Sequence, residues 1–193
     1  AQARAGDRLP DLVAAITRLR AVADVIVTTG GVSAGSHDLV PAAVAAAGGA
    51  TVFHKVAIRP GKPVLAARFP DGGWLLGLPG NPVAVAVGAR FFLVPLLRAL
   101  RGEPPEAVLH ARAATDLKAR GGLLFFGKAR ARVGAAGALT ATLLPGQESF
   151  RVAPLVAANC WLVVPPEPGG VRAGDPVQVV PLGAAGDWLA AGD

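Results

Sequence analysis

The sequence has one cysteine, no methionine and no tyrosine, and its aromatic residues amount to only 5 %. A lone cysteine excludes an internal disulfide framework and a cysteine-based zinc site. Cys160 opens the apolar run Cys160–Val164, which favours a buried and inert thiol. The few aromatics do not alternate with runs of basic residues, so the chain lacks the stacking platform of a nucleic-acid binder, and we expect no nucleic-acid partner.

Long apolar runs are missing as well, because no stretch approaches the ~18 unbroken apolar residues of a membrane helix. No basic-then-apolar signal segment is evident either, so we expect a cytoplasmic protein without a membrane partner. The chain begins at Ala1 and lacks methionine. We therefore expect a C-terminal fragment of a longer protein.

The composition that is present is globular, with 52 % hydrophobic and 17 % charged residues in a chain of 193. The net charge of +6 is uneven. Residues 1–103 hold eleven Lys or Arg against six Asp or Glu, whereas residues 104–193 hold eight against seven. The first part is therefore the better candidate for binding an anion.

Residues 1–103 alternate between helical spacing and β-branched runs, which predicts an open α/β sheet with helices on both faces, a three-layer domain. The predicted helices are Leu9–Arg20, Leu39–Ala47 and Val83–Arg101, the last kinked at Pro95 and ended by Gly102. The predicted strands are Asp24–Thr28, Thr51–Ile58 and a possible hairpin of Val64–Phe69 with Trp74–Leu78.

After Pro104-Pro105 the pattern changes to short β-like runs between glycine- and proline-rich turns. This predicts a small all-β, barrel-like domain over residues 104–183, followed by a tail at 184–193. The predicted strands are Ala107–Ala113, Leu123–Val133, Ala138–Leu143, Trp161–Val164 and Val177–Val180.

The stretch Thr28–Asp38 lies between a predicted strand and a predicted helix, the position at which open α/β sheets bind ligands. Its glycines allow backbone N–H groups to approach an anion, and its hydroxyls add donors. Asp38 has two interpretations, a helix N-cap or a Mg²⁺ ligand. Asp7 has the same ambiguity at the start of the first helix.

Two further loops join this glycine-rich one. Lys55 and Arg59 are expected on one face of a strand because their spacing is even, and Lys62 follows on a proline-stiffened loop, which favours a bound polyanion over a solvated basic patch. Pro79–Pro82 leads into the Val83 helix, with Asn81 suited to the cap and Pro82 to the first turn.

These three loops together resemble the molybdopterin molybdotransferases, the MoeA and gephyrin E-domain group. The matching segments are Thr28–Gly35 with Asp38, Phe53–Pro63 and Gly77–Val83, in that order. The resemblance extends to Ala157-Ala158-Asn159 and Ala173-Gly174-Asp175, and so implies a MogA/MoaB-like domain truncated at its N-terminus and a C-terminal β domain.

The resemblance implies an enzyme that inserts molybdate into adenylylated molybdopterin with release of AMP, in a Mg²⁺-dependent step. It assigns catalytic roles to Asp38, Asp7, Lys55, Arg59 and Lys62, of which Asp38 and Asp7 are the metal ligands. The residues expected to bind the cofactor precursor are Thr29, Gly30, Gly31, Ser33, Gly35, Pro79, Gly80, Asn81 and Pro82. A homodimer is expected, and a molybdopterin adenylyltransferase is a possible partner.

Three departures and two alternatives accompany this interpretation. Ser36 stands where the family usually has an acid, and the family's TGDEL-type motif and its two preceding domains are absent, so the fragment is expected to be inactive alone. One alternative is a molybdopterin adenylyltransferase, against which the additional β domain argues. The other is a non-catalytic scaffold of the gephyrin type.

Overall fold

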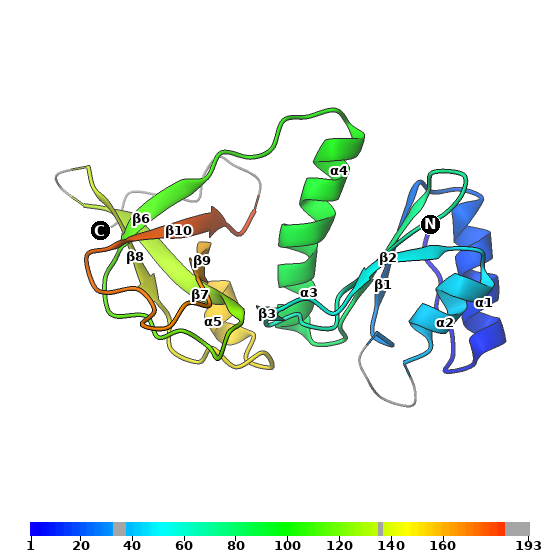
Figure 1. Cartoon of the computed structure of the whole chain (residues 1–193), viewed down its shortest axis with the longest axis horizontal. Coiled ribbons are helices and arrows are strands. Elements are labelled where there is room, and N and C mark those ends of the chain that lie inside the picture. Colours follow the sequence, from blue (N-terminus) through cyan, green and yellow to red (C-terminus); the bar gives the residue numbers. More distant parts are fainter. Residues whose placement is uncertain (33–37, 135–136, 184–193) are drawn as a thin grey trace. The chain divides into compact units, whose positions relative to one another are not determined.

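The computed structural model describes residues 1–32, 38–134 and 137–183, and the chain divides into two compact units (Figure 1). The first, which we call the α/β unit, comprises residues 1–56 and 61–93. The second, the β unit, takes residues 57–60 and the chain from residue 94 onward. The units therefore part before the border predicted at Pro104-Pro105.

The α/β unit is built on a four-stranded mixed sheet in the order β1-β5-β4-β2. Its strands are β1 (Val25–Thr29), β2 (Ala50–His54), β4 (Leu65–Arg68) and β5 (Trp74–Leu78). β1 and β5 run parallel, whereas β4 is antiparallel to both of its neighbours. The predicted hairpin is thus confirmed as β4 and β5.

Helices cover both faces of this sheet, as the sequence predicts. On one face α1 (Leu9–Arg20) and α2 (Val40–Ala46) pack in a core that includes Leu65 and Leu75. On the other face Val64, Ala66, Leu76 and Leu78 form a second core with side chains of the helix that follows β5. Because alternate strand residues point to opposite faces, one short strand can serve both cores.

That following helix is not uniform. It consists of α3 (Pro82–Gly88), a π-helical turn η1 (Ala89–Leu93) and α4 (Val94–Leu100). The π-helical turn ends two residues before Pro95, which has no N–H to offer to the preceding turn, and the kink at Pro95 stays a prediction. Gly102 ends the helix at a φ of 69°, as predicted.

By length and composition alone, the continuous run Pro82–Leu100 could cross a membrane. The sequence criterion of unbroken apolar residues did not single it out, because the run contains Arg90 and Arg98. A mostly buried core helix of a globular protein passes the same test; Val83 and Val87 of α3 are buried, but only 28 % of the window is. The run is therefore weak evidence for a membrane segment.

The β unit contains a small closed barrel, which confirms the predicted barrel-like domain. Its strands follow the order β7-β8-β6-β10-β9, and β9 pairs back onto β7. The strands are β6 (Leu109–Ala113), β7 (Leu124–Val133), β8 (Leu139–Leu143), β9 (Cys160–Val164) and β10 (Pro176–Pro181). A short helix, α5 (Ala153–Ala157), precedes β9 and was not predicted.

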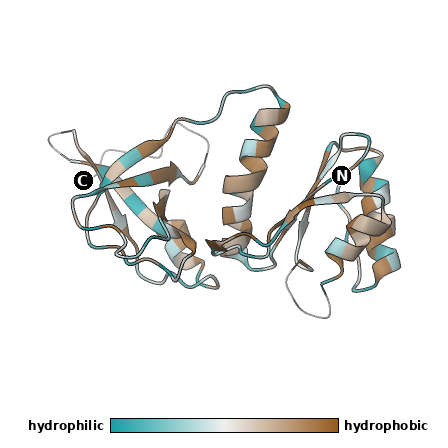
Figure 2. Cartoon of the chain, in the orientation of Figure 1, coloured by the Kyte–Doolittle hydropathy of each residue, from teal (hydrophilic) through white to brown (hydrophobic). Residues whose placement is uncertain are grey.

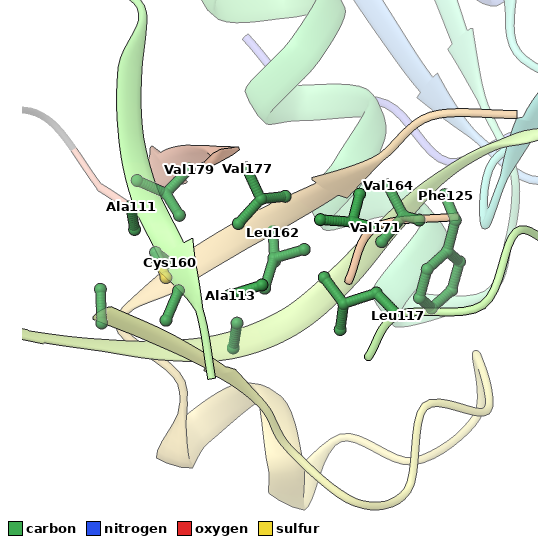
Figure 3. Packing of buried hydrophobic residues seen from close by; sticks show 13 residues of the cluster. Ala111, Ala113, Leu117, Phe125, Cys160, Leu162, Val164, Val171, Val177 and Val179 are labelled. Atoms are coloured by element: carbon green, nitrogen blue, oxygen red, sulfur yellow. The ribbon is translucent and has the colours of Figure 1, made fainter. Parts of the chain in front are cut away.

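The barrel interior holds Phe125 and otherwise small or branched apolar side chains, and the labelled side chains point toward one another in Figure 3. Figure 2 shows the corresponding alternation of hydrophobic and hydrophilic residues along β6. Cys160 is fully buried here, and burial raises the pKa of its thiol to about 12. The predicted inert thiol agrees with this environment.

One predicted element is wrong. The strand predicted over Thr51–Ile58 ends at His54, because Lys55 adopts a φ of 67° that no extended strand allows. Ile58 and Arg59 instead form the short strand β3, which pairs in parallel with β7 of the β unit. Lys55 and Arg59 therefore do not share the face of one strand.

Candidate functional site

The first site loop leaves the carboxyl end of β1. Gly30 and Gly31 turn the chain with φ values of 87° and 68°, and Gly31 accepts a hydrogen bond from the Val40 N–H at the start of α2. Thr28 Oγ1 is buried and has no hydrogen-bond partner in the described part of the chain. Ser33 and Gly35, which the sequence also places in this loop, lie outside the described residues.

The third site loop, which follows β5, lies beside the first because β1 and β5 are parallel neighbours that pair Thr29 with Leu78. The Gly30 N–H donates to the Leu78 carbonyl over 2.9 Å. A Cβ placed on Gly80 would lie 3.6 Å from the Gly30 Cα, so the two backbones run close together. Two of the predicted loops therefore meet.

The predicted cap of the helix after this loop is confirmed. Asn81 is the N-cap of α3, its Oδ1 accepts a hydrogen bond from the Val83 N–H over 3.3 Å, and a proline, Pro82, follows in the first turn. Because Asn81 and Pro82 fix the helix entry, Pro79 and Gly80 form a defined rim beside the glycine turn.

The second site loop begins where β2 ends. The Lys55 N–H donates to the Val64 carbonyl over 3.0 Å, and the Val56 N–H donates to the Lys62 carbonyl over 2.9 Å. These bonds place the backbones of Lys55 and Lys62 at the two sides of one loop neck. Both side chains are exposed, and neither forms an ion pair with any residue of the described ranges.

Arg59, the third predicted cation, is assigned to the β unit through β3, and its side chain is exposed. The structure thus brings Lys55 and Lys62 together within one unit, while Arg59 belongs to the other. Lys55 and Arg59 are separated because β2 ends at His54 and does not continue into β3.

His54, to which sequence reasoning gave no role, joins the second loop to the first. Its Nε2 lies 2.9 Å from the carbonyl oxygen of Val32, and the side chain is half-buried. A carbonyl only accepts, so Nε2 carries the hydrogen of this bond. One feature of the sequence could have identified His54: it is a polar residue in a predicted strand, directly before the cation Lys55.

Neither of the two predicted acids, Asp38 and Asp7, is the N-cap of a helix. Leu39, and not Asp38, is the N-cap of α2, and no side chain caps that helix. Asp38 is half-buried at the end of the first loop. Asp7 is exposed and precedes Arg8, the N-cap of α1. In Figure 1 the start of α1 and the carboxyl end of β1 lie at the same end of the sheet.

No group of three or more His, Cys, Asp or Glu side chains that could hold a metal ion occurs among the described residues. A divalent ion at this end of the sheet would therefore rely on one or two carboxylates. Mg²⁺ is commonly bound in this way, with water and substrate phosphates as its other ligands.

The arrangement favours an anionic ligand. The glycine turn and Thr28 lie at the carboxyl end of β1, and Lys55 follows the carboxyl end of β2, which runs in the same direction as β1. Thr28 Oγ1 has no described hydrogen-bond partner, and the side chains of Lys55 and Lys62 are exposed. The hydrogen bonds of the loop neck fix the backbones of Lys55 and Lys62, so less ordering of the backbone is required when a phosphate binds.

Comparisons with known proteins agree with the order of these loops. Residues 1–99 match the family described as a probable molybdopterin binding domain, and residues 110–182 match the family described as the MoeA C-terminal region, domain IV. The molybdopterin molybdenumtransferase of Synechococcus elongatus is 41 % identical over 155 residues, which are 80 % of this chain and 37 % of the relative.

The corresponding transferase of Haemophilus influenzae is 33 % identical over 165 residues, covering 83 % of this chain and 40 % of that protein. The crystal structure of a molybdopterin biosynthesis MoeA protein from Pyrococcus horikosii superposes with a TM-score of 0.72 at 25 % identity, covering 94 % of this chain and 43 % of the other. The chain therefore spans about two fifths of the length of these relatives.

Proposed function

This chain belongs to the family of probable molybdopterin-binding domains with a MoeA C-terminal region, and we propose that it forms part of a molybdopterin molybdotransferase. The reaction would insert molybdate into adenylylated molybdopterin and release AMP. The observation that carries the proposal is the meeting of three loops in one unit, through the Gly30–Leu78 and His54–Val32 hydrogen bonds beside Lys55 and Lys62.

Each part of the site has a proposed role. Lys55 and Lys62 balance the charge of the pterin phosphate and of molybdate, a role that the resemblance also gives to Arg59. Charge-assisted contacts of this kind act as the phosphoanhydride breaks and negative charge collects on the leaving AMP. The wall of the pocket is formed by Thr29, Gly30, Gly31, Pro79, Gly80, Asn81 and Pro82, and on the resemblance also by Ser33 and Gly35.

Asp38 is the proposed Mg²⁺ ligand, and Asp7 the second. Asp38 fits this role because it is half-buried beside the glycine turn and is not the cap of α2. A bound Mg²⁺ ion would supply Lewis-acid stabilisation of phosphate charge. The carboxylates themselves would hold the ion, and the lysines would orient the phosphate.

The two alternatives make different demands. A molybdopterin adenylyltransferase would not need the β unit, and residues 110–182 match a MoeA region, which favours the molybdotransferase. A non-catalytic scaffold would not need two cations on a rigid loop neck. We further propose that the protein acts as a homodimer in the cytoplasm and receives its substrate from an adenylyltransferase. We also propose that the border between the two domains lies between residues 103 and 104.

The test is anaerobic calorimetry of the chain with molybdopterin and with adenylylated molybdopterin. We expect saturable binding of both, with Mg²⁺ strengthening the second. Asp38→Ala is expected to remove the Mg²⁺ effect while leaving the far-ultraviolet circular dichroism unchanged. If neither compound binds, the enzyme interpretation fails, and an unchanged Mg²⁺ effect in Asp38→Ala would refute the assignment of that carboxylate.

A further inference from the structure

The His54 side chain connects two site loops that are separate in sequence. It stands at the last position of β2, half-buried, and its Nε2–H donates to the Val32 carbonyl over 2.9 Å. A neutral hydrogen bond of this kind contributes little to global stability. Its effect is instead to fix the relative position of the two backbones that it joins.

Val32 is the point at which the first loop is held against the sheet. Its side chain is only 1 % exposed, and a Cβ on Gly77 would lie 2.7 Å from its Cγ1. Gly77 therefore makes room for Val32 in the middle of β5. The Val32 side chain thus packs on the sheet, while its carbonyl accepts the hydrogen bond of His54.

The glycine turn is consequently held on both sides. Gly30 donates its N–H to the Leu78 carbonyl before the turn, and Val32 accepts from His54 after it. Gly30 and Gly31 both have positive φ. As glycines they have no side chains whose contacts could hold the turn in place. Without the His54 bond, the Val32 side would keep the packing of its side chain and the bond from the Val40 N–H to the Gly31 carbonyl, but no contact with β2 through the Val32 carbonyl.

The residue after His54 is the first cation of the site. Lys55 leaves β2 with a φ of 67°, and its N–H is bonded to the Val64 carbonyl. The same short segment therefore fixes the Val32 carbonyl through its ring and the origin of the Lys55 side chain through its backbone. Any movement of His54 would be transmitted to both.

We propose that His54 is a positioning residue, which sets the distance between the glycine turn and the lysines so that both reach one phosphate-bearing pterin. The inference rests on the proposed function for the identity of the ligand. It does not make His54 a catalytic residue, because the ring is engaged with backbone. The backbone coupling itself is a property of the chain without ligand.

The test compares two amides that differ only in reach. In His54→Gln the side-chain nitrogen stands as many bonds from Cα as Nε2 does, so it can still donate to Val32. In His54→Asn the nitrogen is one bond short. His110→Leu, on an exposed position of β6 in the β unit, is the matched control for loss of an imidazole.

Binding of molybdopterin to the whole chain is measured by anaerobic calorimetry. We expect His54→Asn to weaken binding about five- to tenfold, the value of one hydrogen bond, and His54→Gln to stay within about threefold of the unsubstituted chain. His110→Leu is expected to bind as the unsubstituted chain does. Equal binding by His54→Asn and His54→Gln would overturn the proposal.

A ligand-free measurement separates this inference from the proposed function. Amide hydrogen exchange at Gly30 and Val40, whose N–H groups close the two ends of the turn, is expected to be faster in His54→Asn than in His54→Gln. If the unsubstituted chain does not bind molybdopterin, the proposed function fails, but this difference in exchange would still support the coupling. Equal exchange in the two variants would overturn it.

Discussion

The two units use a lysine in opposite ways. In the α/β unit, Lys55 is exposed on a loop neck and forms no ion pair within the described ranges. In the β unit, Lys128 is 1 % exposed, and its Nζ donates to the carbonyls of Gly146, Glu148 and Arg151 over 2.7, 3.1 and 3.0 Å. The Lys55 ammonium group is accessible to a ligand, whereas the Lys128 ammonium group uses its three donors in hydrogen bonds within the β unit.

The difference teaches how to distinguish a binding cation from a structural one. The three donors of the Lys128 ammonium match three carbonyls, and Gln147 completes the loop by bonding the Lys128 backbone at both its N–H and its carbonyl. Burial nevertheless lowers the pKa of Lys128, because the charged form loses hydration. Such a site has no capacity left for a ligand.

The largest expected effect is on the β unit. Lys128→Met would remove all three donors and leave the carbonyls of the 146–151 loop without them, at a cost of roughly 3 kcal/mol in unfolding free energy. Alkylation of Cys160, the single cysteine, reports opening of this barrel core. We expect faster alkylation in Lys128→Met.

Arg130→Met is the control for this prediction, because Arg130 neighbours Lys128 on β7 but is exposed, and surface changes of this kind cost less than about 0.5 kcal/mol. Equal alkylation rates in the two variants would show that the buried ammonium is not needed by the fold.

The next effect is on binding by the α/β unit. Lys55→Ala and Lys62→Ala are each expected to weaken molybdopterin binding by about tenfold to a hundredfold, the value of a hydrogen bond to a charged group, without changing the unfolding midpoint. Lys118→Ala, an exposed lysine of the β unit, changes the net charge equally. If its affinity falls as far as that of the other two, the effect is only long-range charge.

A smaller effect separates conformation from ligand contact. Gly31→Ala places a Cβ at a φ of 68°, 3.0 Å from Val40 Cγ2, and Gly121→Ala places one at a φ of 60° in open space. Each is expected to cost about 1 kcal/mol of stability because of its φ. Urea unfolding first establishes that the two variants have the same stability. Calorimetry should then show weaker molybdopterin binding only in Gly31→Ala.

The smallest effect concerns pH. The Gly73 N–H and the Arg20 guanidinium hold the pKa of Asp71 below its usual value of 3.8. A carboxyl with a lowered folded pKa contributes stability that is present above pH 3.8 and is lost as pH falls through the folded pKa. Asp71→Asn should therefore differ from the unsubstituted chain in urea midpoint at neutral pH and converge with it in acid. Parallel curves over the whole pH range would contradict this.

The sequence predicted what depends on local pattern. The alternation of helix and strand up to Gly102, the cap at Asn81 and all five barrel strands follow from spacing, turn residues and capping chemistry. Hydrophobic periodicity is local, so these elements needed no knowledge of the partners across the sheet.

Non-local contacts were not predictable in the same way. Nothing in the sequence around Lys55 indicates its left-handed backbone. The strand β3 forms only because Ile58 pairs with Leu124 on β7. The contact of His54 with Val32 spans 22 residues, and the three acceptors of Lys128 lie 18 to 23 residues along the chain. Each depends on which backbones the fold brings together, which a periodic pattern does not encode.

The central claim is that the ligand binds at the three loops of the α/β unit. It does not bind at Lys128 of the β unit, because all three donors of that ammonium group are already used in hydrogen bonds. Amide hydrogen exchange of the whole chain, with and without saturating molybdopterin, tests this claim most directly. We predict ligand-dependent protection in residues 28–32, 53–56, 61–64 and 77–83, with no change in residues 144–152. Protection of residues 144–152 alone, or of neither region at saturation, would contradict the account.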